Sequence, residues 1–170
     1  KMKPYQQIAI AECNEPLVSI PLEQFVVESP HPYQKLGADY KGRSPYCLRQ
    51  SVLEALIKAQ AILQNRHLDW CIKIFDAYRP VEVQQFMVDR TFASVLRDRN
   101  LNPEQLSLQE KENIWSQVDQ FWAIPSNDPK TPPPHSTGAA IDVTLIDADG
   151  VTLDLGSEID ELGSRSHPNY

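Results

Sequence analysis

Hydrophobic residues in the middle of the chain recur at helical spacing. Over residues 51–65 they form one stripe, made of Val52, Leu53, Leu56, Ile57, Ala59, Ile62 and Leu63. Apolar positions three and four residues apart share one side of a helix, so the pattern predicts a helix with one buried face. Ser51 comes just before the stripe. Its hydroxyl can accept a hydrogen bond from an amide of the first turn, so we expect Ser51 to cap the helix.

Two more helices are predicted downstream, each with a proline near its start. Residues 80–98 have an apolar face made of Val83, Phe86, Met87, Val95 and Leu96. Pro80 suits the first helical position, where the amide hydrogen has no partner. The segment Asn102-Pro103-Glu104-Gln105 has the order of a cap, a proline and a capping-box glutamine, which predicts the start of a further helix. The apolar face of that helix is less regular and includes Leu106, Ile114, Val118 and Phe121.

Alternating apolar and polar positions predict strands on both sides of the second helix. Residues 70–75 alternate in this way, and residues 139–146 keep a strict two-residue period. In the later segment Ile141, Val143 and Leu145 share one face, and Asp142 lies on the other. Asp149-Gly150 then predicts a hairpin turn that leads into a return strand over residues 151–153.

Two shorter apolar segments near the N-terminus complete the predicted elements. Residues 8–11 and 25–28 are typical of short strands, and proline-rich loops separate them. We expect an α+β fold, a single domain in which helices pack on one face of a mainly antiparallel sheet.

Length and composition agree with an ordinary globular domain. The chain has 170 residues, of which 41% are hydrophobic and 23% charged, enough for one domain with a core. Its longest apolar runs are a few residues long, far below the roughly 20 that cross a membrane. It has only 6 glycines, and none lies between Gly42 and Gly138. A glycine-rich phosphate-binding loop is therefore excluded from that part of the chain.

The net charge of −7 is concentrated near the C-terminal end. Residues 141–170 contain one base, Arg165, and seven acids: Asp142, Asp147, Asp149, Asp154, Glu158, Asp160 and Glu161. This negative field disfavours nucleic acid and anionic membrane surfaces as partners, and it favours a metal or another cation. The alternative interpretation is a solvated acidic face that keeps the protein soluble.

The cysteines and the N-terminus bear on the cellular compartment. Cys13, Cys47 and Cys71 are an odd number without C-x-x-C spacing, so a disulfide framework is not expected. Residues 1–10 contain three consecutive apolar residues, too few for the core of a signal peptide. We expect the cytoplasm by default, with the periplasm as the alternative because a signal peptide can be removed.

His135 and Asp142 are the strongest candidates for chemistry. His135 follows three consecutive prolines, and Asp142 lies on the predicted strand after it, so both have rigid supports. Gly138 lets the chain turn sharply between them. An imidazole and a carboxylate are two of the three protein ligands that a catalytic zinc requires. A histidine and an aspartate at this spacing also occur in hydrogen-bonded surface turns, and the spacing alone does not separate the two interpretations.

A second candidate is Asp76-Ala77-Tyr78-Arg79-Pro80, at the end of a predicted strand. Pro80 biases the backbone of Arg79 away from helix, so the guanidinium is held where the strand ends. There it can stabilise a developing oxyanion or hold a carboxylate. The alternative is an ion pair between Arg79 and Asp76 that ties the turn.

Together the two segments resemble the zinc D-alanyl-D-alanine dipeptidases. These are relatives of the vancomycin-resistance dipeptidase, within the wider group of D,D-carboxypeptidases and hedgehog-like metal domains. Residues 133–142 fit the family pattern S-x-H-x-x-G-x-A-x-D at every fixed position except the leading serine, which is replaced by Pro133. The resemblance continues through residues 155–160 and 164–167, and it covers most of residues 33–170.

The resemblance implies zinc-dependent hydrolysis of D-Ala-D-Ala, or of a similar D-amino-acid dipeptide or peptidoglycan fragment, by a metal-activated water. It implies that one Zn²⁺ binds to His135 and Asp142, and that Arg79 is the catalytic residue that stabilises the oxyanion.

It also implies where the substrate lies. Asp160 and Ser166 fall in the segment that borders the substrate in the family, and we assign them, with Asp76, to substrate binding. Asp160 suits the free ammonium group of a dipeptide.

The chain departs from the family in the second half of the metal site. The third zinc ligand and the general base of the family come from a downstream E-x-x-H motif, and no such motif follows Asp142 in this sequence. We therefore expect a single zinc-peptidase-like domain over residues 1–170, truncated at its C-terminal end, with the missing motif beyond Tyr170. His167 is the alternative ligand. The alternative functions are another cell-wall D,D-carboxypeptidase or L,D-endopeptidase, and a metal- or peptide-binding module without catalysis.

Overall fold

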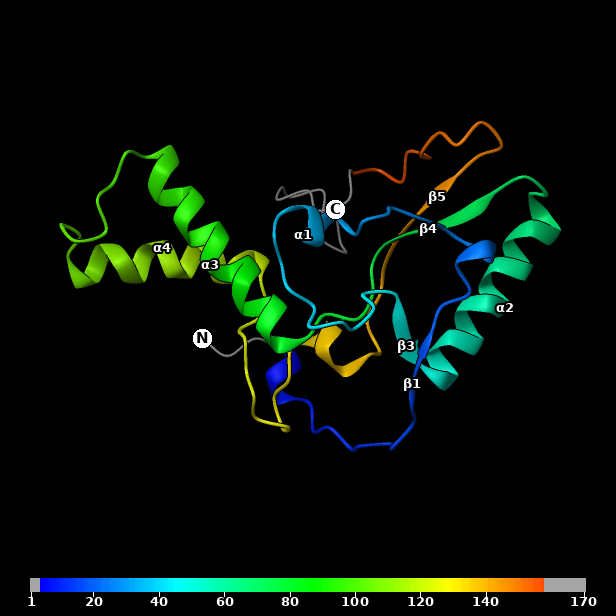
Figure 1. The fold of residues 1–170 in the computed structure, drawn as a ribbon, viewed down its shortest axis with the longest axis horizontal. Coiled ribbons are helices and arrows are strands. Elements are labelled where there is room, and N and C mark those ends of the chain that lie inside the picture. Colours follow the sequence, from blue (N-terminus) through cyan, green and yellow to red (C-terminus); the bar gives the residue numbers. More distant parts are fainter. Residues whose placement is uncertain (1–3, 158–170) are drawn as a thin grey trace.

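Two small sheets lie at the centre of the computed structural model, which describes residues 4–157 (Figure 1). The strands are β1 (Leu17–Ser19), β2 (Val26–Val27), β3 (Cys47–Arg49), β4 (Cys71–Asp76) and β5 (Asp142–Ile146). The α-helices are α1 (Pro32–Lys35), α2 (Gln50–Arg66), α3 (Val81–Asp98) and α4 (Leu108–Phe121). Three 3₁₀ turns are η1 (Pro4–Gln7), η2 (Leu22–Gln24) and η3 (Pro134–Thr137). The predicted α+β class is confirmed.

The strands pair in two ways. β1 pairs with β3 in antiparallel orientation, and this pair forms the first sheet. In the second sheet β4 is central, parallel to β2 and antiparallel to β5. The strands thus belong to two sheets, where the sequence predicted one. Residues 8–11, expected to be a strand, form none.

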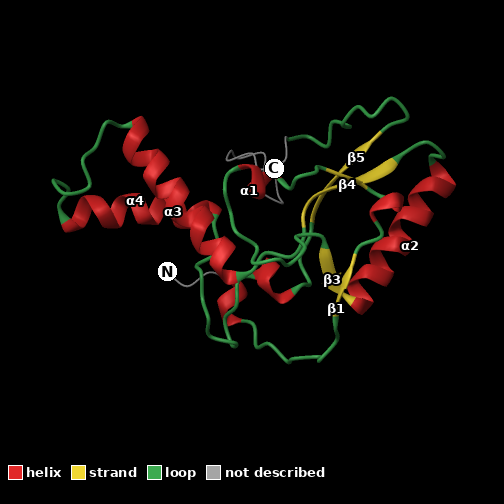
Figure 2. Ribbon diagram, viewed as in Figure 1, coloured by secondary structure: helices red, strands yellow, loops and turns green. Residues whose placement is uncertain are grey.

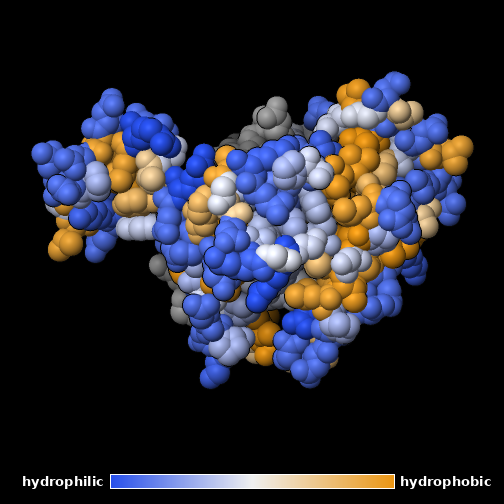
Figure 3. All heavy atoms as spheres, in the orientation of Figure 1, coloured by the Kyte–Doolittle hydropathy of each residue, from blue (hydrophilic) through white to orange (hydrophobic). Residues whose placement is uncertain are grey.

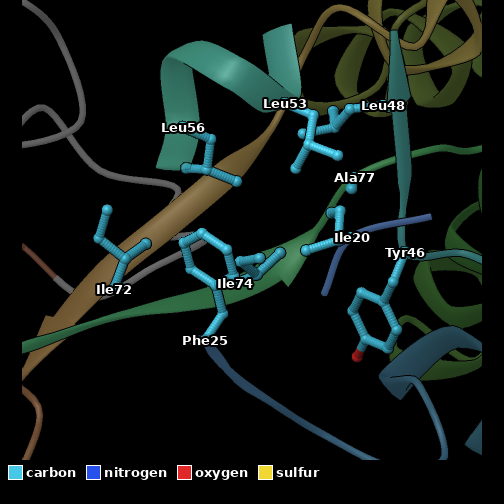
Figure 4. Packing of buried hydrophobic residues seen from close by; sticks show 9 residues of the cluster. All are labelled: Ile20, Phe25, Tyr46, Leu48, Leu53, Leu56, Ile72, Ile74 and Ala77. Carbon is cyan, nitrogen blue, oxygen red and sulfur yellow. The ribbon is translucent and has the colours of Figure 1, made fainter. Parts of the chain in front are cut away.

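Helix α2 covers the sheets and makes the main hydrophobic core. Leu53 and Leu56 on its inner face pack with Leu48 of β3 and Ile74 of β4, and Leu48 and Ile74 are completely buried (Figure 4). Each fully buried Leu or Ile side chain stabilises the fold by about 1.5–3 kcal/mol. Figure 3 shows hydrophobic residues gathered on this side of the molecule, where α2 meets the strands. This core holds β4 in place, and β4 leads into the candidate site.

The start of α2 differs from the sequence prediction. The helix begins at Gln50, and Arg49 occupies the cap position without a side-chain hydrogen bond. Ser51 is not the cap; its backbone amide and its hydroxyl both donate to Oε2 of Glu15, at 2.9 and 2.8 Å. Those two hydrogen bonds lower the pKa of Glu15. A carboxylate 36 residues away in the sequence therefore takes the capping role.

Helices α3 and α4 pack against each other and form an arm that extends away from the sheets (Figure 2). Near the middle of the arm the rings of Phe92 and Trp115 stack at 4.2 Å. The predicted start of α4 at Asn102 is wrong, because the helix begins after Ser107. The Ser107 side chain accepts from the amide of Glu110, and Glu110 completes the capping box.

The first turn of α3 belongs to a second core cluster. Val83 and Met87 pack there with Tyr33 and Tyr40, and the ring of Trp122 covers the cluster from outside. This cluster lies beside the segment that carries Arg79.

Strand β5 and its turn follow the prediction in part. β5 begins at Asp142, three residues later than expected, and Val143 is 40% exposed, whereas Ile146 is buried. The turn after β5 is closed by a hydrogen bond from the amide of Gly150 to the carbonyl of Asp147, at 3.0 Å. The predicted return strand is reduced to a single bridge between Ile146 and Thr152.

None of the helices over residues 4–157 is both long and apolar enough to serve as a membrane span.

Candidate active site

The pairing of β4 with β5 brings together two aspartates that are far apart in the sequence. Asp76, the last residue of β4, lies opposite Asp142, the first residue of β5, after an irregularity in the register between Ile74 and Asp76. Asp76 is fully buried, whereas the side chain of Asp142 is 38% exposed. One carboxylate thus lies inside the protein and the other at its surface.

Hydrogen bonds join the segment after β4 to η3. The amide of Arg79 donates to the carbonyl of His135 at 3.2 Å, and the hydroxyl of Ser136 donates to the carbonyl of Arg79 at 2.7 Å. The two segments identified in the sequence are therefore bound to each other through their backbones.

Gly138 lets η3 end close to the first sheet. Its φ is +74°, in the left-handed region, and a Cβ there would lie 2.3 Å from Cδ2 of Leu17. Arg49, at the end of β3, holds this turn: its amide donates to the carbonyl of Gly138 at 2.8 Å, and its Nε donates to the carbonyl of Thr137 at 2.9 Å. The backbone around His135 is fixed from two sides.

The surroundings of His135 determine which ring nitrogen is open to a ligand. Nδ1 lies 2.8 Å from the carbonyl oxygen of Ala77. A carbonyl can only accept, so Nδ1 carries a proton, and Nε2, which faces Asp142, is the nitrogen that can bind a ligand once it has released its own proton. Nε2 lies 3.3 Å from Oδ2 of Asp142. Orientation of one nitrogen by a carbonyl is the usual support of a metal-binding histidine.

The charges around His135 favour a cation at Nε2. Burial alone lowers the pKa of His135, but the hydrogen bond to Asp142 and the charge of Asp76 raise it more, so the pKa lies above the usual value. The same carboxylates that stabilise a proton at this position would stabilise a metal ion.

The spacing of the donor atoms also fits zinc. Two ligand atoms bound at about 2.0–2.1 Å to a tetrahedral zinc lie about 3.3–3.4 Å apart. The 3.3 Å between Nε2 of His135 and Oδ2 of Asp142 matches this value. Among the described residues, Asp76, His135 and Asp142 form a group whose ligand atoms lie within 4.8 Å of one another.

Asp76 does not belong to the same ligand set. Its Oδ2 lies 3.6 Å from Nδ1 of His135, on the side of the ring that donates to Ala77. The same oxygen accepts from Nε of Arg79 at 2.9 Å and from Nη2 of Arg79. The residues that the structure describes thus supply two of the three protein ligands that a catalytic zinc takes.

Arg79 is held on all sides. Besides its ion pair with Asp76, Nη1 donates to Oε1 of Gln84 at 2.7 Å and Nη2 to the hydroxyl of Tyr33 at 3.2 Å. The rings of Tyr33 and Trp122 each lie 5.0 Å from the guanidinium carbon. Burial opposes the charge of Arg79, but the Asp76 carboxylate outweighs it and the pKa of Arg79 is raised. The ion pair considered as the alternative role of Arg79 is therefore present.

A histidine that the sequence analysis missed completes the cluster. Nε2 of His31, which is completely buried, lies 3.1 Å from Oδ1 of Asp76. Burial raises the pKa of Asp76, but His31, Arg79 and His135 lower it by a larger amount, so Asp76 remains a carboxylate. The sequence analysis did not single out His31, whose partner Asp76 is 45 residues away.

The structure brings together four of the residues singled out from the sequence: Asp76, Arg79, His135 and Asp142. Asp160, Ser166 and His167 lie outside the described residues. The contacts of the buried Asp76 described above are all with protein groups, and its assignment to substrate binding stays a prediction. Gln84 was also missed, because it lies on the apolar face of α3 between Val83 and Met87.

Residues 27–170 match the D-Ala-D-Ala dipeptidase family of peptidases. The chain belongs to this family. A D-alanyl-D-alanine dipeptidase from Synechocystis sp. is 54% identical to it over 169 residues, which cover 99% of this chain and 68% of that protein. No solved structure matches the chain. The resemblance inferred from the two motifs is confirmed, and all four clustered residues lie within the part that matches the D-Ala-D-Ala dipeptidase family.

Proposed function

We propose that this member of the D-Ala-D-Ala dipeptidase family hydrolyses D-Ala-D-Ala, or a similar D-amino-acid dipeptide, and requires zinc. The observation that carries the proposal is the arrangement of His135. One nitrogen donates to the carbonyl of Ala77, and the other lies 3.3 Å from a carboxylate oxygen of Asp142. This pair fits the spacing, the ring orientation and the negative charge that a zinc ion needs.

In this proposal His135 and Asp142 bind the metal, and Arg79 stabilises the negative charge that develops during the reaction. When bound, zinc supplies an activated water and polarises the peptide carbonyl. His135 and Asp142 hold the ion. Arg79 provides a fixed positive charge beside them, suited to the carbonyl oxygen as it becomes negative. The buried Asp76 fixes the direction of that guanidinium.

The first test is the metal content of the full-length gene product. We expect His135→Ala and Asp142→Asn each to lower the zinc retained after dialysis and to reduce release of alanine from D-Ala-D-Ala at least about 100-fold, because each removes a ligand. His67→Ala is the matched control, since His67 is exposed and stacks on Trp70 outside the cluster. Unchanged zinc content and turnover in the two ligand variants would refute the proposed metal site.

The second measurement addresses the substrate. Rates are compared for D-Ala-D-Ala, L-Ala-L-Ala and a peptidoglycan pentapeptide that ends in D-Ala-D-Ala. The proposal requires the D,D-dipeptide to be the best of the three. Faster cleavage of the pentapeptide would identify a carboxypeptidase instead.

A further inference from the structure

His31 is a buried histidine that the proposed chemistry leaves without a role. Its Nδ1 accepts the backbone amide of Tyr33 at 3.1 Å, at the start of α1. A nitrogen that accepts carries no proton, so the proton of the neutral ring is on Nε2. Nε2 lies 3.1 Å from Oδ1 of Asp76, within ion-pair distance, and in the part of the chain that the structure describes neither atom has a partner in regular hydrogen-bond geometry, so each is the nearest polar group left for the other.

Asp76 uses its two oxygens for different partners. Oδ2 accepts hydrogen bonds from Nε and Nη2 of Arg79, and Oδ1 lies beside Nε2 of His31. The terminal torsion of an aspartate has a broad energy profile, so contacts to one oxygen leave the carboxylate plane loosely defined. A donor on the second oxygen fixes that plane, and the plane sets the direction of the guanidinium bound to it.

Three tyrosines hold the imidazole of His31 in this position. The ring centroids of Tyr33, Tyr40 and Tyr46 lie 5.1, 5.7 and 5.3 Å from that of His31. All three tyrosines are buried, as are His31 and Asp76. The imidazole is therefore packed on several sides and is buried together with Oδ1 of Asp76.

From this arrangement we propose that His31 is a positioning residue for catalysis. Its Nε2–H fixes the carboxylate of Asp76, and Asp76 in turn fixes the guanidinium of Arg79 in the direction that the reaction needs. The contacts of His31 described above are with Asp76 and the three tyrosines, and we propose that it acts only through Asp76. The inference rests on the proposed function in one respect, that Arg79 acts on the substrate.

Kinetics of two substitutions test the role. We expect His31→Leu to lower kcat about 10- to 100-fold, the usual effect of losing a group that orients an active-site residue. Because the metal ligands and the substrate contacts remain, zinc content and KM should stay within about twofold of wild type. His31→Gln keeps a side-chain N–H donor and should recover most of kcat. Equal losses in the two variants would overturn the role of the Nε2 proton.

A double substitution separates positioning from general damage. In the Arg79→Ala background, His31→Leu should lower kcat no further, because the residue through which it acts is gone. If the two losses multiply instead, His31 does not act through Arg79 and the proposal is wrong.

Nitrogen NMR of the zinc-free full-length protein tests the geometry without activity. The His31 ring should be the neutral Nε2–H tautomer, and the Nε–H of Arg79 should exchange slowly with solvent. An Nδ1–H tautomer or an imidazolium in the wild type would contradict the proposal, even if His31→Leu failed to fold. Faster exchange of the Arg79 proton is expected in His31→Leu but not in the control His67→Leu. Loss of the dipeptidase activity alone, with these signals intact, would refute the proposed function and not this geometry.

Discussion

Gln84 supports Arg79 from the side opposite Asp76. Its side chain is completely buried; Oε1 accepts from Nη1 of Arg79 and Nε2 donates to the carbonyl of Ala123, both at 2.7 Å. Replacing it with leucine leaves two buried polar groups without their partner. We expect Gln84→Leu to lower the free energy of unfolding by about 1–3 kcal/mol, measured by urea denaturation.

The neighbouring glutamine is the control for this substitution. Gln85 is on the same helix but exposed, and its side chain donates to Oδ1 of Asp89 at 2.8 Å. Gln85→Leu should change the free energy of unfolding by less than about 0.5 kcal/mol. An equal effect of the two substitutions would show that the hydrogen bonds of Gln84 contribute nothing specific.

The site residues found from the sequence and those missed differ in a physical way. His135 and Arg79 each lie next to a proline, where the local sequence itself shows that a side chain is held rigidly. His31 and Gln84 derive their roles from partners in other elements. Their local sequence is that of an ordinary loop and of a helix face, so only the tertiary structure reveals them.

At the scale of one element, the capping box of α4 can be tested directly. Oγ of Ser107 accepts a hydrogen bond from the amide of Glu110. In turn, Oε2 of Glu110 accepts hydrogen bonds from the amide and the hydroxyl of Ser107, at 2.8 and 2.7 Å. We expect Ser107→Ala to lower the free energy of unfolding by about 1 kcal/mol, a typical value for a lost cap. Ser116→Ala, at an exposed position inside the same helix, should be neutral or slightly stabilising.

The contribution of this capping box to the free energy of unfolding should depend on pH. The hydrogen bonds from Ser107 lower the pKa of Glu110 below its usual 4.5. A lowered pKa stabilises the fold above the pKa of the unfolded chain, and this contribution disappears as the pH falls through the folded value. The difference between wild type and Ser107→Ala should therefore shrink below pH 4.5. If the difference in the free energy of unfolding between the two proteins stays constant down to pH 3, the carboxylate of Glu110 does not contribute to the capping box.

The wrong start of α4 shows why helix ends are difficult to predict here. Two capping signals lie five residues apart, one at Asn102 and one at Ser107. Oδ1 of Asn102 accepts the amide of Glu104 at 3.0 Å, which closes a turn and not a helix. Both signals are satisfied locally, and the helix that buries Ile114 and Val118 begins at the second, where Ser107 and Glu110 form a complete capping box.

At the scale of the whole molecule, the helices and the central strand follow from local patterns, whereas the pairing of strands does not. β1 and β3 are three residues long, too short for a periodic signal, and the parallel contact of β2 with β4 joins segments 47 residues apart. The pairing of β4 with β5 is also long-range, and it brings Asp76 and Asp142 to the same edge of the sheet. The candidate site exists because of that pairing, so the sequence could name its residues more easily than its geometry.

The tyrosines around His31 make the stability of the whole molecule sensitive to alkaline pH. The hydroxyl of Tyr46 donates to the carbonyl of Glu28 at 2.6 Å and thereby links β3 to the end of β2. Burial, together with the charges of Glu28 and Asp76, raises the pKa of Tyr46 to about 12 from the usual 10.0. The unfolded chain therefore releases this proton first, and the free energy of unfolding should fall as the pH rises from about 10 to 12.

Urea denaturation at pH 8, 9, 10 and 11 measures this dependence. Tyr46→Phe removes the titrating hydroxyl while it keeps the ring beside His31, so the variant should be less stable than wild type at pH 8 but should lose less stability as the pH rises. Lysine ionisation affects both proteins equally and cancels in the comparison. Parallel curves for the two proteins would mean that Tyr46 ionises as readily in the folded state as in the unfolded chain, and that its hydroxyl does not link the two sheets.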